Sequence, residues 1–392
     1  MGRKSSRRNF LGTAVFAGGA AAAGAQSAGA QTRKIPAVDL IKVGFACVGS
    51  NSHAGLWAPT INTVEGSGWP GRTTRMLITH TWDSRPEAAD QFAKQFGCEA
   101  VKNYDDMVGK VDAMIFGGFF EAPWWPQLTR PYIEAGIPCY IDRPIGHSME
   151  KARAVVELAR KHNTPLMTCD GHAILEEAKI ARMLVEKYRK EGKEIIGATG
   201  YNYTTSDYPQ HVIHGLNYLF TTFGLEVEKI SLLADGWWRE KTPTNPVQMT
   251  YGTLTLLYNG VKVEGAEDQK RRFLATQIQV QDEHSFSNLR IYYSKGQNQG
   301  EWVDIDNRQS RYDPMDRQYY LNFPTVLYMQ KMFETRKMPF TYDQILLQNR
   351  IFLAGWKSHL DHGGMLYAVN DLPDDWEAPA VYPDWMDESI FQ

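Results

Sequence analysis

Residues 43–55 read VGFACVGSNSHAG, and this stretch decides the fold class. Its first half is an apolar strand pattern, its second half is rich in Gly and Ser, and a segment of helical character follows. A strand, a tight turn and a helix in this order are typical of the phosphate-binding loop of α/β proteins. Of the pattern G-x-G-x-x-G, Cys47-x-Gly49-x-x-Ser52 keeps only the middle glycine, which lets the backbone approach a pyrophosphate. A purely structural turn explains the same residues equally well.

Downstream of this turn, short apolar strand patterns alternate with helical patterns. The alternation predicts parallel βαβ units and therefore a doubly wound sheet. The expected strands are Val43–Val48, Arg75–Thr81, Ala113–Phe116, Cys139–Ile141 and Leu166–Cys169. The expected helices run from the first turn to about Val64 and over Pro86–Phe96, Tyr104–Val108, Trp125–Ala135 and Met149–His162.

Beyond residue 170 the pattern changes to long β-rich runs separated by turn residues, which predict a large, mostly antiparallel sheet that is open on one face. These runs are Ile195–Tyr203, Glu228–Gly236, Thr250–Tyr258, Phe273–Val280 and Leu289–Tyr293. Helices are expected at Glu176–Glu191, Thr325–Thr335 and Tyr342–Leu360. We therefore expect an α/β protein with a Rossmann domain over residues 38–170 and a second α/β domain, for substrate binding and oligomerisation, over residues 171–392.

The first thirty residues are predicted to be a twin-arginine signal peptide. Residues 6–11 (SRRNFL) precede a weakly apolar Ala/Gly run and the small residues Ala28–Ala30. We therefore expect export to the periplasm. Losing four cations and no acid moves the formal charge from −3 to −7, which gives no reason to expect nucleic acid as a partner. No other segment reaches eighteen apolar residues, so no membrane contact is expected after signal removal.

Three segments follow one another at the spacing seen in the Gfo/Idh/MocA oxidoreductases. They are DSRPEAADQFAKQFG (83–97), VDAMIFGG (111–118) and YIEAGIPCYIDRPIGHSMEKARAVVELARKHN (132–163). The chain resembles this family over residues 41 to about 170 and more loosely beyond. The resemblance implies a Rossmann domain followed by an α/β domain with an open sheet, and NAD(P)-dependent oxidation or reduction of sugars and polyols. It also implies NAD or NADP as a cofactor, held tightly in some exported members.

The cofactor would be bound by the first turn and by the end of the second strand. The expected phosphate-binding residues are Gly49, Ser50, Asn51 and Ser52. Asp83 follows the second strand, where an acid commonly binds a ribose diol, although it could also be the N-cap of the next helix. The nearby Arg85 leaves NADP open. Cys47, Cys98, Cys139 and Cys169 form no C-x-x-C and are predicted to be buried thiols.

The family's Glu-Lys-Pro motif, whose lysine takes part in proton transfer, aligns with Asp142-Arg143-Pro144. An arginine stays protonated, so Arg143 is expected to clamp a hydroxyl or carbonyl oxygen rather than to act as a base. Asp142 and Arg143 are also expected to contact the cofactor. The alternative for Arg143 is a salt bridge at the domain junction. A cis bond before Pro144 is compatible with the turn.

The family's second signature, Asp-x-Gly-x-His-x-x-Asp, aligns with QHVIHGLN (210–217). His214 keeps the place of the catalytic histidine, while Gln210 and Asn217 replace the two acids. One helix face carries polar residues without any charged one, which indicates a lined cavity rather than a solvated surface. His214 is the expected general acid/base, with His211 as a second candidate. The expected substrate-binding residues are Gln210, Asn217, Tyr201, Tyr203 and His172.

Three functions remain open. The first is an NAD(P)-dependent oxidoreductase acting on a sugar, glycoside or polyol, in which His214 moves the proton and Arg143 polarises the oxygen. The second is a redox-neutral lyase or hydrolase that cleaves a glycoside with tightly bound NAD or a metal, since the periplasm offers no obvious NAD pool. The third is a carbohydrate-binding protein that has lost the cofactor. A metal would be held by His211 and His214, with further ligands from Asp170, His172, His359, Asp361 and His362, but no spacing matches an established zinc motif.

Overall fold

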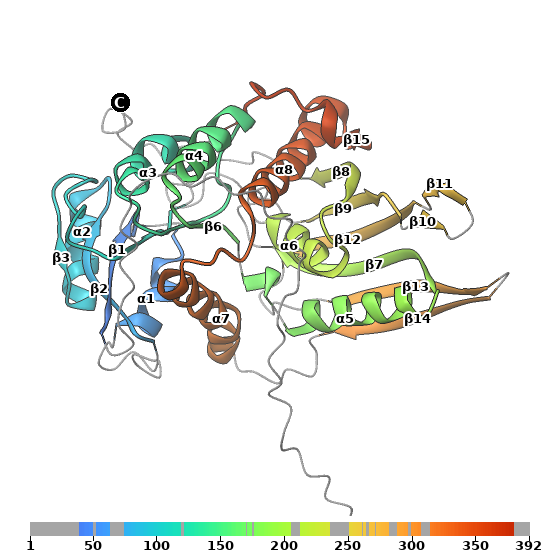
Figure 1. The fold of residues 1–392 in the computed structure, drawn as a ribbon, viewed down its shortest axis with the longest axis horizontal. Coiled ribbons are helices and arrows are strands. Elements are labelled where there is room, and N and C mark those ends of the chain that lie inside the picture. The colour runs from blue at the N-terminus through green and yellow to red at the C-terminus, as the bar shows by residue number, and fades with distance from the viewer. Residues whose placement is uncertain are drawn as a thin grey trace, which may run out of the picture. The chain divides into compact units, whose positions relative to one another are not determined.

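Two β-sheets, each covered by helices, make up the described part of the chain (Figure 1). The computed structural model describes residues 39–49, 52–62, 74–118, 121–169, 171–174, 176–204, 212–235, 251–260, 262–263, 266–270, 272–281, 288–296, 299–306 and 314–379. These residues belong to one compact unit, Lys34–Gln392. The predicted signal peptide lies outside them.

The first sheet is parallel throughout, with the strand order β3-β2-β1-β4-β5-β6. Its strands are β1 (Ile41–Ala46), β2 (Met76–Trp82), β3 (Glu99–Ala100), β4 (Ala113–Phe116), β5 (Cys139–Ile141) and β6 (Leu166–Met167). This is the order of a dinucleotide-binding Rossmann sheet, in which the direction of winding reverses between β1 and β4. The predicted doubly wound sheet is confirmed.

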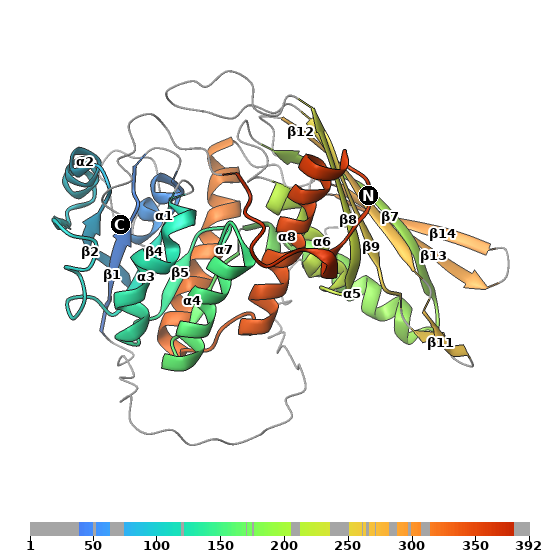
Figure 2. The same cartoon turned by 90° about the horizontal axis from the view of Figure 1, so that it is seen from above.

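Helices cover both faces of the first sheet (Figure 2). α3 (Trp125–Glu134) and α4 (Met149–His162) cover one face, and α1 (Ala54–Ile61) and α2 (Pro86–Phe96) cover the other. The strands are apolar on both sides for this reason. In β4, for example, alternate residues belong to the two different cores: Met114 and Phe116 to the first, Ala113 and Ile115 to the second.

Helix α7 (Pro314–Thr335) completes the second of these cores, although it lies far beyond residue 170 in the sequence. Its residues Val326, Met329 and Phe333 are buried with the side chains of α1 and α2. The core of the parallel sheet therefore depends on a segment from the C-terminal half of the chain.

The second sheet is mixed, with the order β14-β13-β7-β12-β9-β8-β15. Its strands are β7 (Glu194–Thr204), β8 (Val227–Asp235), β9 (Tyr251–Tyr258), β12 (Phe273–Gln281), β13 (Asn288–Gly296), β14 (Gln299–Asp306) and β15 (Tyr367–Ala368). Among the described strands only β7 and β12 run parallel to each other in this sheet. β10 (Lys262–Val263) and β11 (Ala266–Lys270) pair separately as a short hairpin.

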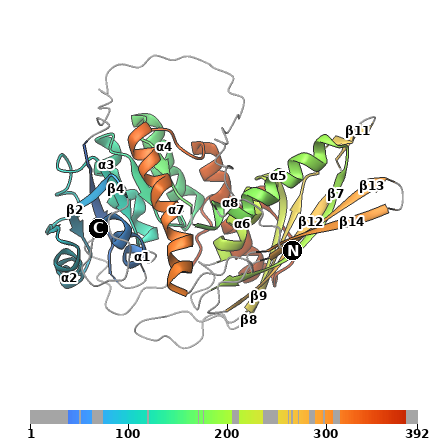
Figure 3. The ribbon, with the colours of Figure 1, turned by 90° about the horizontal axis from the view of Figure 1, so that it is seen from below.

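One face of the second sheet packs on α5 (Glu176–Lys190), α6 (Val212–Phe223) and α8 (Tyr342–His362) (Figure 3). No described helix covers the other face, which we call the open face. Its exposed apolar side chains come from four strands and are Ile196, Leu233, Leu274, Ile278 and Trp302. The predicted large, mostly antiparallel sheet with one open face is confirmed.

Most predicted elements agree with the observed ones, but α7 begins at Pro314 instead of Thr325, and β15 and the hairpin of β10 and β11 were not expected. Three further differences have a local cause. Residues 104–108 form turns instead of a helix, because Asp106 accepts the Asn103 N–H at 2.8 Å and Gly109 has a left-handed φ of 79°. The short edge strand β3 was not expected, since two residues carry no readable pattern. β14 was not expected either, because QGEWVDID has few apolar residues. α8 ends at His362, two residues beyond the expected Leu360, and Gly363 is its left-handed C-cap.

Candidate active site

The candidate site lies at the carboxyl ends of β1 and β4, where the winding of the sheet reverses. Parallel α/β sheets bind their ligands in the crevice at this point. The loops that follow the two strands contact each other: the His53 N–H donates to the Gly117 carbonyl at 3.0 Å, and Ser52 forms a bridge with Gly118. Side chains from both loops and from α6 of the second sheet's layer meet here.

The first turn is tied to the end of β2. The Gly49 N–H donates to Asp83 Oδ2 at 2.7 Å, and Asp83 Oδ1 accepts the Arg85 N–H at 2.9 Å. A Cβ on Gly49 would lie 1.9 Å from Arg85 Nη2, so the close approach at this glycine is made by the guanidinium of Arg85. The N-cap alternative for Asp83 is wrong, because Arg85 is the N-cap residue of α2. Ser50 and Asn51 lie outside the described residues.

Cys47 takes the place of the first glycine of the pattern and has a left-handed backbone with φ 60°. Its side chain is buried, and burial together with the carboxyl groups of Glu121 and Asp83 raises the pKa of the thiol well above its ordinary value. A thiol in these surroundings is not a nucleophile. All four cysteines are free, with only Cys98 partly exposed, which confirms the prediction of thiols.

Glu121 is a buried acid that the sequence did not reveal as part of the site. It follows β4, and its carboxyl group fills the space beside Gly118, where a Cβ would lie 2.0 Å from Oε2. Burial, and secondarily the charge of Asp83, raises the pKa of Glu121 to about 8. Burial also raises the pKa of Asp83, against the hydrogen bonds from Arg85 and Gly49. Glu121 therefore holds its proton at neutral pH.

The described residues fit a dinucleotide at two points. The carboxylate of Asp83 ends β2, where it would bind a ribose diol. Gly55 stands in the first turn of α1 with no atom within 4 Å of its Cβ position, which leaves the helix N-terminus open to a diphosphate. Arg85 adds a cation beside the same loop. An NAD-type cofactor would thus be held by Asp83, Arg85 and the backbone that leads into α1.

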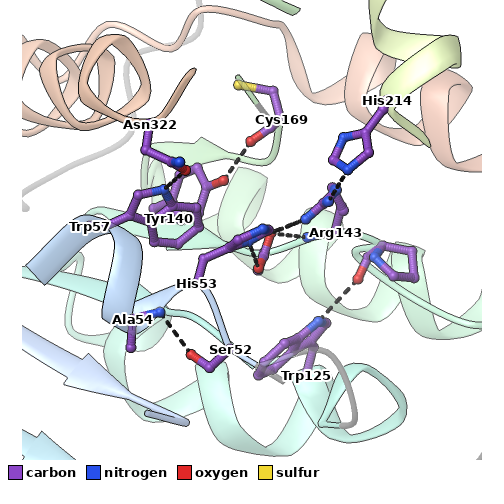
Figure 4. Close-up of polar contacts among 12 residues, drawn as sticks. Ser52, His53, Ala54, Trp57, Trp125, Tyr140, Arg143, Cys169, His214 and Asn322 are labelled. Atoms are coloured by element: carbon purple, nitrogen blue, oxygen red, sulfur yellow. Dashed lines mark hydrogen bonds and ion pairs between the residues drawn. The ribbon is translucent and has the colours of Figure 1, made fainter. Parts of the chain in front are cut away.

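Arg143 contacts both Asp142 and His214, and Figure 4 shows its contact with His214. Asp142 and Arg143 follow β5 and are buried, with 0% and 1% of their surface exposed. Asp142 Oδ1 accepts from the Arg143 N–H at 2.9 Å and from Nη1 at 3.2 Å. Arg143 Nη2 lies 3.1 Å from His214 Nε2 on α6. A guanidinium can only donate, so this nitrogen of His214 carries a lone pair.

His53 is the second residue that the sequence did not single out. Its Nδ1 lies 2.6 Å from Asp142 Oδ2 and 3.2 Å from Arg143 Nη1. Because the contact with the carboxylate is the shorter one, Nδ1 carries the proton and donates to Asp142. Arg143 forms an ion pair with Asp142, as the salt-bridge alternative predicted. Its guanidinium lies between the imidazoles of His53 and His214. Its role toward a substrate oxygen stays a prediction. The Arg143–Pro144 bond is cis.

The polar face of α6 is only partly described. His214 and Asn217 are buried, with 5% and 3% of their surface exposed. Asn217 Nδ2 has no hydrogen-bond partner among the described residues, which leaves a donor one turn from His214. Gln210 and His211 lie outside the described residues. Of His172 and Tyr203 only the backbone is described, and the segment of His172 touches α6 through the Thr221 hydroxyl, which donates to Ala173 O at 2.8 Å.

The structure does not bring Tyr201 to the site. Tyr201 pairs in parallel register with Ile278, which is 55% exposed on the open face, whereas the buried pair Ala198 and Ala275 faces the helices. Residues an odd number apart on a strand face opposite sides, so Tyr201 lies on the sheet face away from α6 and His214. This placement does not support the expected role of Tyr201 in substrate binding, which stays a prediction.

Among the described residues, no group of three or more His, Cys, Asp or Glu is placed to hold a metal ion. Asp361 accepts instead from Lys357 Nζ at 2.5 Å and from Trp376 Nε1 at 3.0 Å. Since His211 and Asp170 are not described, the metal alternative stays untested. No described helix is long and apolar enough to cross a membrane.

Residues 46–169 match the family model GFO_IDH_MocA, described as "Oxidoreductase family, NAD-binding Rossmann fold". The comparison with curated proteins gave no match. Similar solved structures include scyllo-inositol dehydrogenase from Lactobacillus casei with bound NAD(H) and scyllo-inositol. It shows 13% identity and a TM-score of 0.61 over 85% of this chain and 100% of that one.

Myo-inositol 2-dehydrogenase from Lactobacillus plantarum shows 15% identity and a TM-score of 0.60 over 84% of this chain and 99% of that one. An oxidoreductase from Agrobacterium radiobacter in complex with NAD+, L-tartaric acid and magnesium shows 12% identity and a TM-score of 0.57, covering 85% and 99%. At such identities the likeness concerns the fold. The chain therefore has the fold of the Gfo/Idh/MocA oxidoreductases, and its first sheet carries the match to the family model.

Proposed function

We propose that the protein is an NAD-dependent oxidoreductase that acts on a CH–OH group of a sugar, glycoside or polyol. The observation that carries this proposal is the buried contact between Arg143 and His214, at the edge of a parallel sheet whose loops fit a dinucleotide. The similar structures include a scyllo-inositol dehydrogenase bound to NAD(H) and scyllo-inositol, which supports a polyhydroxylated substrate. A cofactor held tightly enough to survive purification is part of the proposal.

The chain's own residues would divide the work as follows. NAD, when bound, supplies the hydride acceptor. In the structure the lone pair of His214 Nε2 accepts from Arg143 Nη2. When the substrate oxygen takes over this donor, the lone pair would be available to accept the hydroxyl proton of the substrate, whereas Arg143 cannot take a proton. Arg143 Nη2 would donate to the substrate oxygen and stabilise its developing negative charge. Asp142 keeps the guanidinium oriented through two hydrogen bonds, and the buried surroundings of this pair exclude water.

The first experiment is to denature the natively purified protein and identify any released nucleotide by mass spectrometry. The second follows NAD reduction at 340 nm across a panel of inositols, free sugars and glycosides. We expect released or added NAD(H) and a polyhydroxylated substrate. If the folded protein neither carries nor binds NAD or NADP, the proposal fails and a binding protein without a cofactor takes its place.

A redox-neutral cleavage of a glycoside with tightly bound NAD is the second candidate, and one observation favours it. His53 stands on the other side of Arg143 from His214, so two imidazoles flank one cation. Simple oxidation needs one base. Cleavage needs a second base, which removes the C–H proton next to the transient carbonyl. The glycosidic oxygen then leaves with a proton, and the hydride is returned to the carbonyl carbon. Product formation without a net change at 340 nm would identify this reaction.

We propose further that two copies of the chain associate through the open face of the second sheet. Its residues form rows across the strands, such as Leu233, Thr253 and Ile278, and Trp302 at one end is 59% exposed. Arg290 and Asp304 on the same face pair with each other at 2.6 Å and supply charges of both signs. Sedimentation of the wild type and of Ile278→Glu tests this, and a monomeric wild type would refute it.

Export by the twin-arginine route remains a proposal as well. It rests on residues 6–11 (SRRNFL) and on the Ala/Gly run that follows them. Replacing Arg7 and Arg8 by lysine in a tagged full-length chain should leave the unprocessed protein in the cytoplasm. Equal processing of both forms would contradict the proposed route.

A further inference from the structure

His53 connects the loop after β1 to the buried guanidinium of Arg143. Its backbone is the N-cap of α1, next to the loop residues that would hold the cofactor phosphates. Its side chain reaches Asp142, which holds Arg143. One residue therefore belongs to both halves of the candidate site, the part that would bind the cofactor and the part that would handle the proton.

The position of the His53 ring is fixed by its neighbours. The ring lies 4.8 Å from the ring of Trp57, and the Trp57 indole N–H donates to Asn322 Oδ1 at 3.0 Å. On the backbone side, the His53 N–H donates to Gly117. These contacts orient the imidazole toward Arg143 (Figure 4). Its Nδ1 meets Asp142 Oδ2 at 2.6 Å.

The two oxygens of Asp142 have separate partners. Oδ1 accepts from Arg143 twice, and Oδ2 accepts from His53. The carboxylate is fully buried, so without His53 its Oδ2 would lose its charge-assisted hydrogen bond in a place of low polarity. The carboxylate would then turn, and the Arg143 guanidinium would lose the alignment that brings Nη2 to His214. His53 therefore determines the direction in which Arg143 donates.

We propose that His53 is a positioning residue that couples the binding of the cofactor at the loop to the orientation of Arg143. This inference rests on the proposed function. A diphosphate at the N-terminus of α1 would fix the backbone of His53, and the same backbone aims its side chain at Asp142. By linkage, a residue that aligns Arg143 also affects the affinity for the cofactor.

Two isomeric substitutions separate this role from a merely structural one. His53→Asn places an amide N–H near the position of Nδ1 and should still donate to Asp142, whereas His53→Gln places it near the position of Nε2. We expect His53→Asn to keep kcat within about fivefold of the wild type and His53→Gln to lower kcat by about 10- to 100-fold, with a smaller change in KM for the substrate. His80→Gln is the control, because His80 on β2 contacts Thr79 and Glu99 instead of the site.

The measurements are kcat and KM on the substrate found in the panel, and the affinity for NADH by fluorescence titration, which needs no turnover. In an Arg143→Lys background, His53→Gln should lower kcat by less than about threefold, because the group that it positions is gone. Equal loss in the Asn and Gln variants, no loss in either, or full additivity with Arg143→Lys would each overturn the inference. A wild type that binds no NADH would overturn the proposed function first, so the two failures are distinguishable.

Discussion

His147 is the buried titratable group whose effect on stability can be worked out most directly. It follows the cis-Pro turn, has 3% of its surface exposed, and lies 6.2 Å from the ring of Trp356. Neither ring nitrogen has a hydrogen-bond partner among the described residues. Burial, and to a smaller extent the charge of Lys151, lowers the pKa of His147 from 6.5 to about 4, against the opposing effect of Glu377. The folded protein therefore holds this side chain neutral.

The sign follows from the two protonation states. Between pH 6.5 and 4 the unfolded chain binds a proton at this residue and the folded chain does not, so stability falls as the pH falls through this window. The difference between a pKa of 6.5 in the unfolded chain and about 4 in the folded protein corresponds to about 3 kcal/mol in total. About 2 kcal/mol of this is lost by pH 5, and above pH 7 the residue contributes almost no pH dependence.

Urea unfolding of the wild type and of His147→Gln at pH 7 and pH 5 tests this value. Glutamine has a similar volume and does not titrate, so subtracting the two pH dependences cancels the other groups, which both proteins share. We expect the wild type to lose about 2 kcal/mol more than His147→Gln between pH 7 and pH 5. Equal losses, within about 0.5 kcal/mol, would show that His147 is protonated in the folded state or reaches water.

Three further predictions concern the candidate site. Since the pKa of Glu121 is raised to about 8, the folded protein favours the protonated form of this residue and loses stability as the pH rises from 4.5 toward 8. We therefore expect Glu121→Gln to be more stable than the wild type at pH 8 but not at pH 4, as measured by thermal unfolding. Gly49→Ala would place a Cβ against Arg85 Nη2, which is the end of a movable side chain, so we expect the free energy of unfolding to change by less than about 1 kcal/mol. We expect the affinity for NADH to be about tenfold lower, as measured by a fluorescence titration. Arg143→Lys should lower kcat by about tenfold or more, because one ammonium replaces a guanidinium that donates to Asp142 and His214 at once; unchanged kcat would remove Arg143 from the mechanism.

The sequence allowed the prediction of both sheets because their strands follow simple rules of burial. A strand buried on both sides reads as a continuous apolar run, as AMIF at Ala113–Phe116 does, and a half-buried strand alternates, as FLATQIQVQ at Phe273–Gln281 does. α7 shows what these rules leave out. Its pattern predicts a helix, but its packing against the first sheet depends on tertiary contacts of Val326 and Phe333 that no local pattern records.

The candidate site was predictable only where a family motif marks the residue. Arg143 and His214 stand at motif positions, and the structure brings them to 3.1 Å. His53 and Glu121 stand at no motif position and enter the site because two loops cross beyond β1 and β4. Tyr201 was chosen as an aromatic residue on a strand, and the face on which it lies is decided by strand register, which the sequence of one strand does not reveal.

Two departures from the family motifs, arginine instead of lysine at residue 143 and asparagine instead of an acid at residue 217, both change the charge of the candidate site. Arg143 is permanently cationic and is paired with the carboxylate of Asp142, while His214 and Asn217 on α6 are hydrogen-bonding groups without a negative charge. If an acid stood at residue 217, as in the family motif, it would lie one turn from His214 and could compete with the substrate for the guanidinium. An amide at this position does not compete, so under the proposed function the guanidinium could still donate to the developing negative charge of a substrate oxygen. Under the proposed function, the arginine in place of the family's lysine and the amide in place of its acid on α6 would act together, with proton transfer assigned to His214 and charge stabilisation to Arg143.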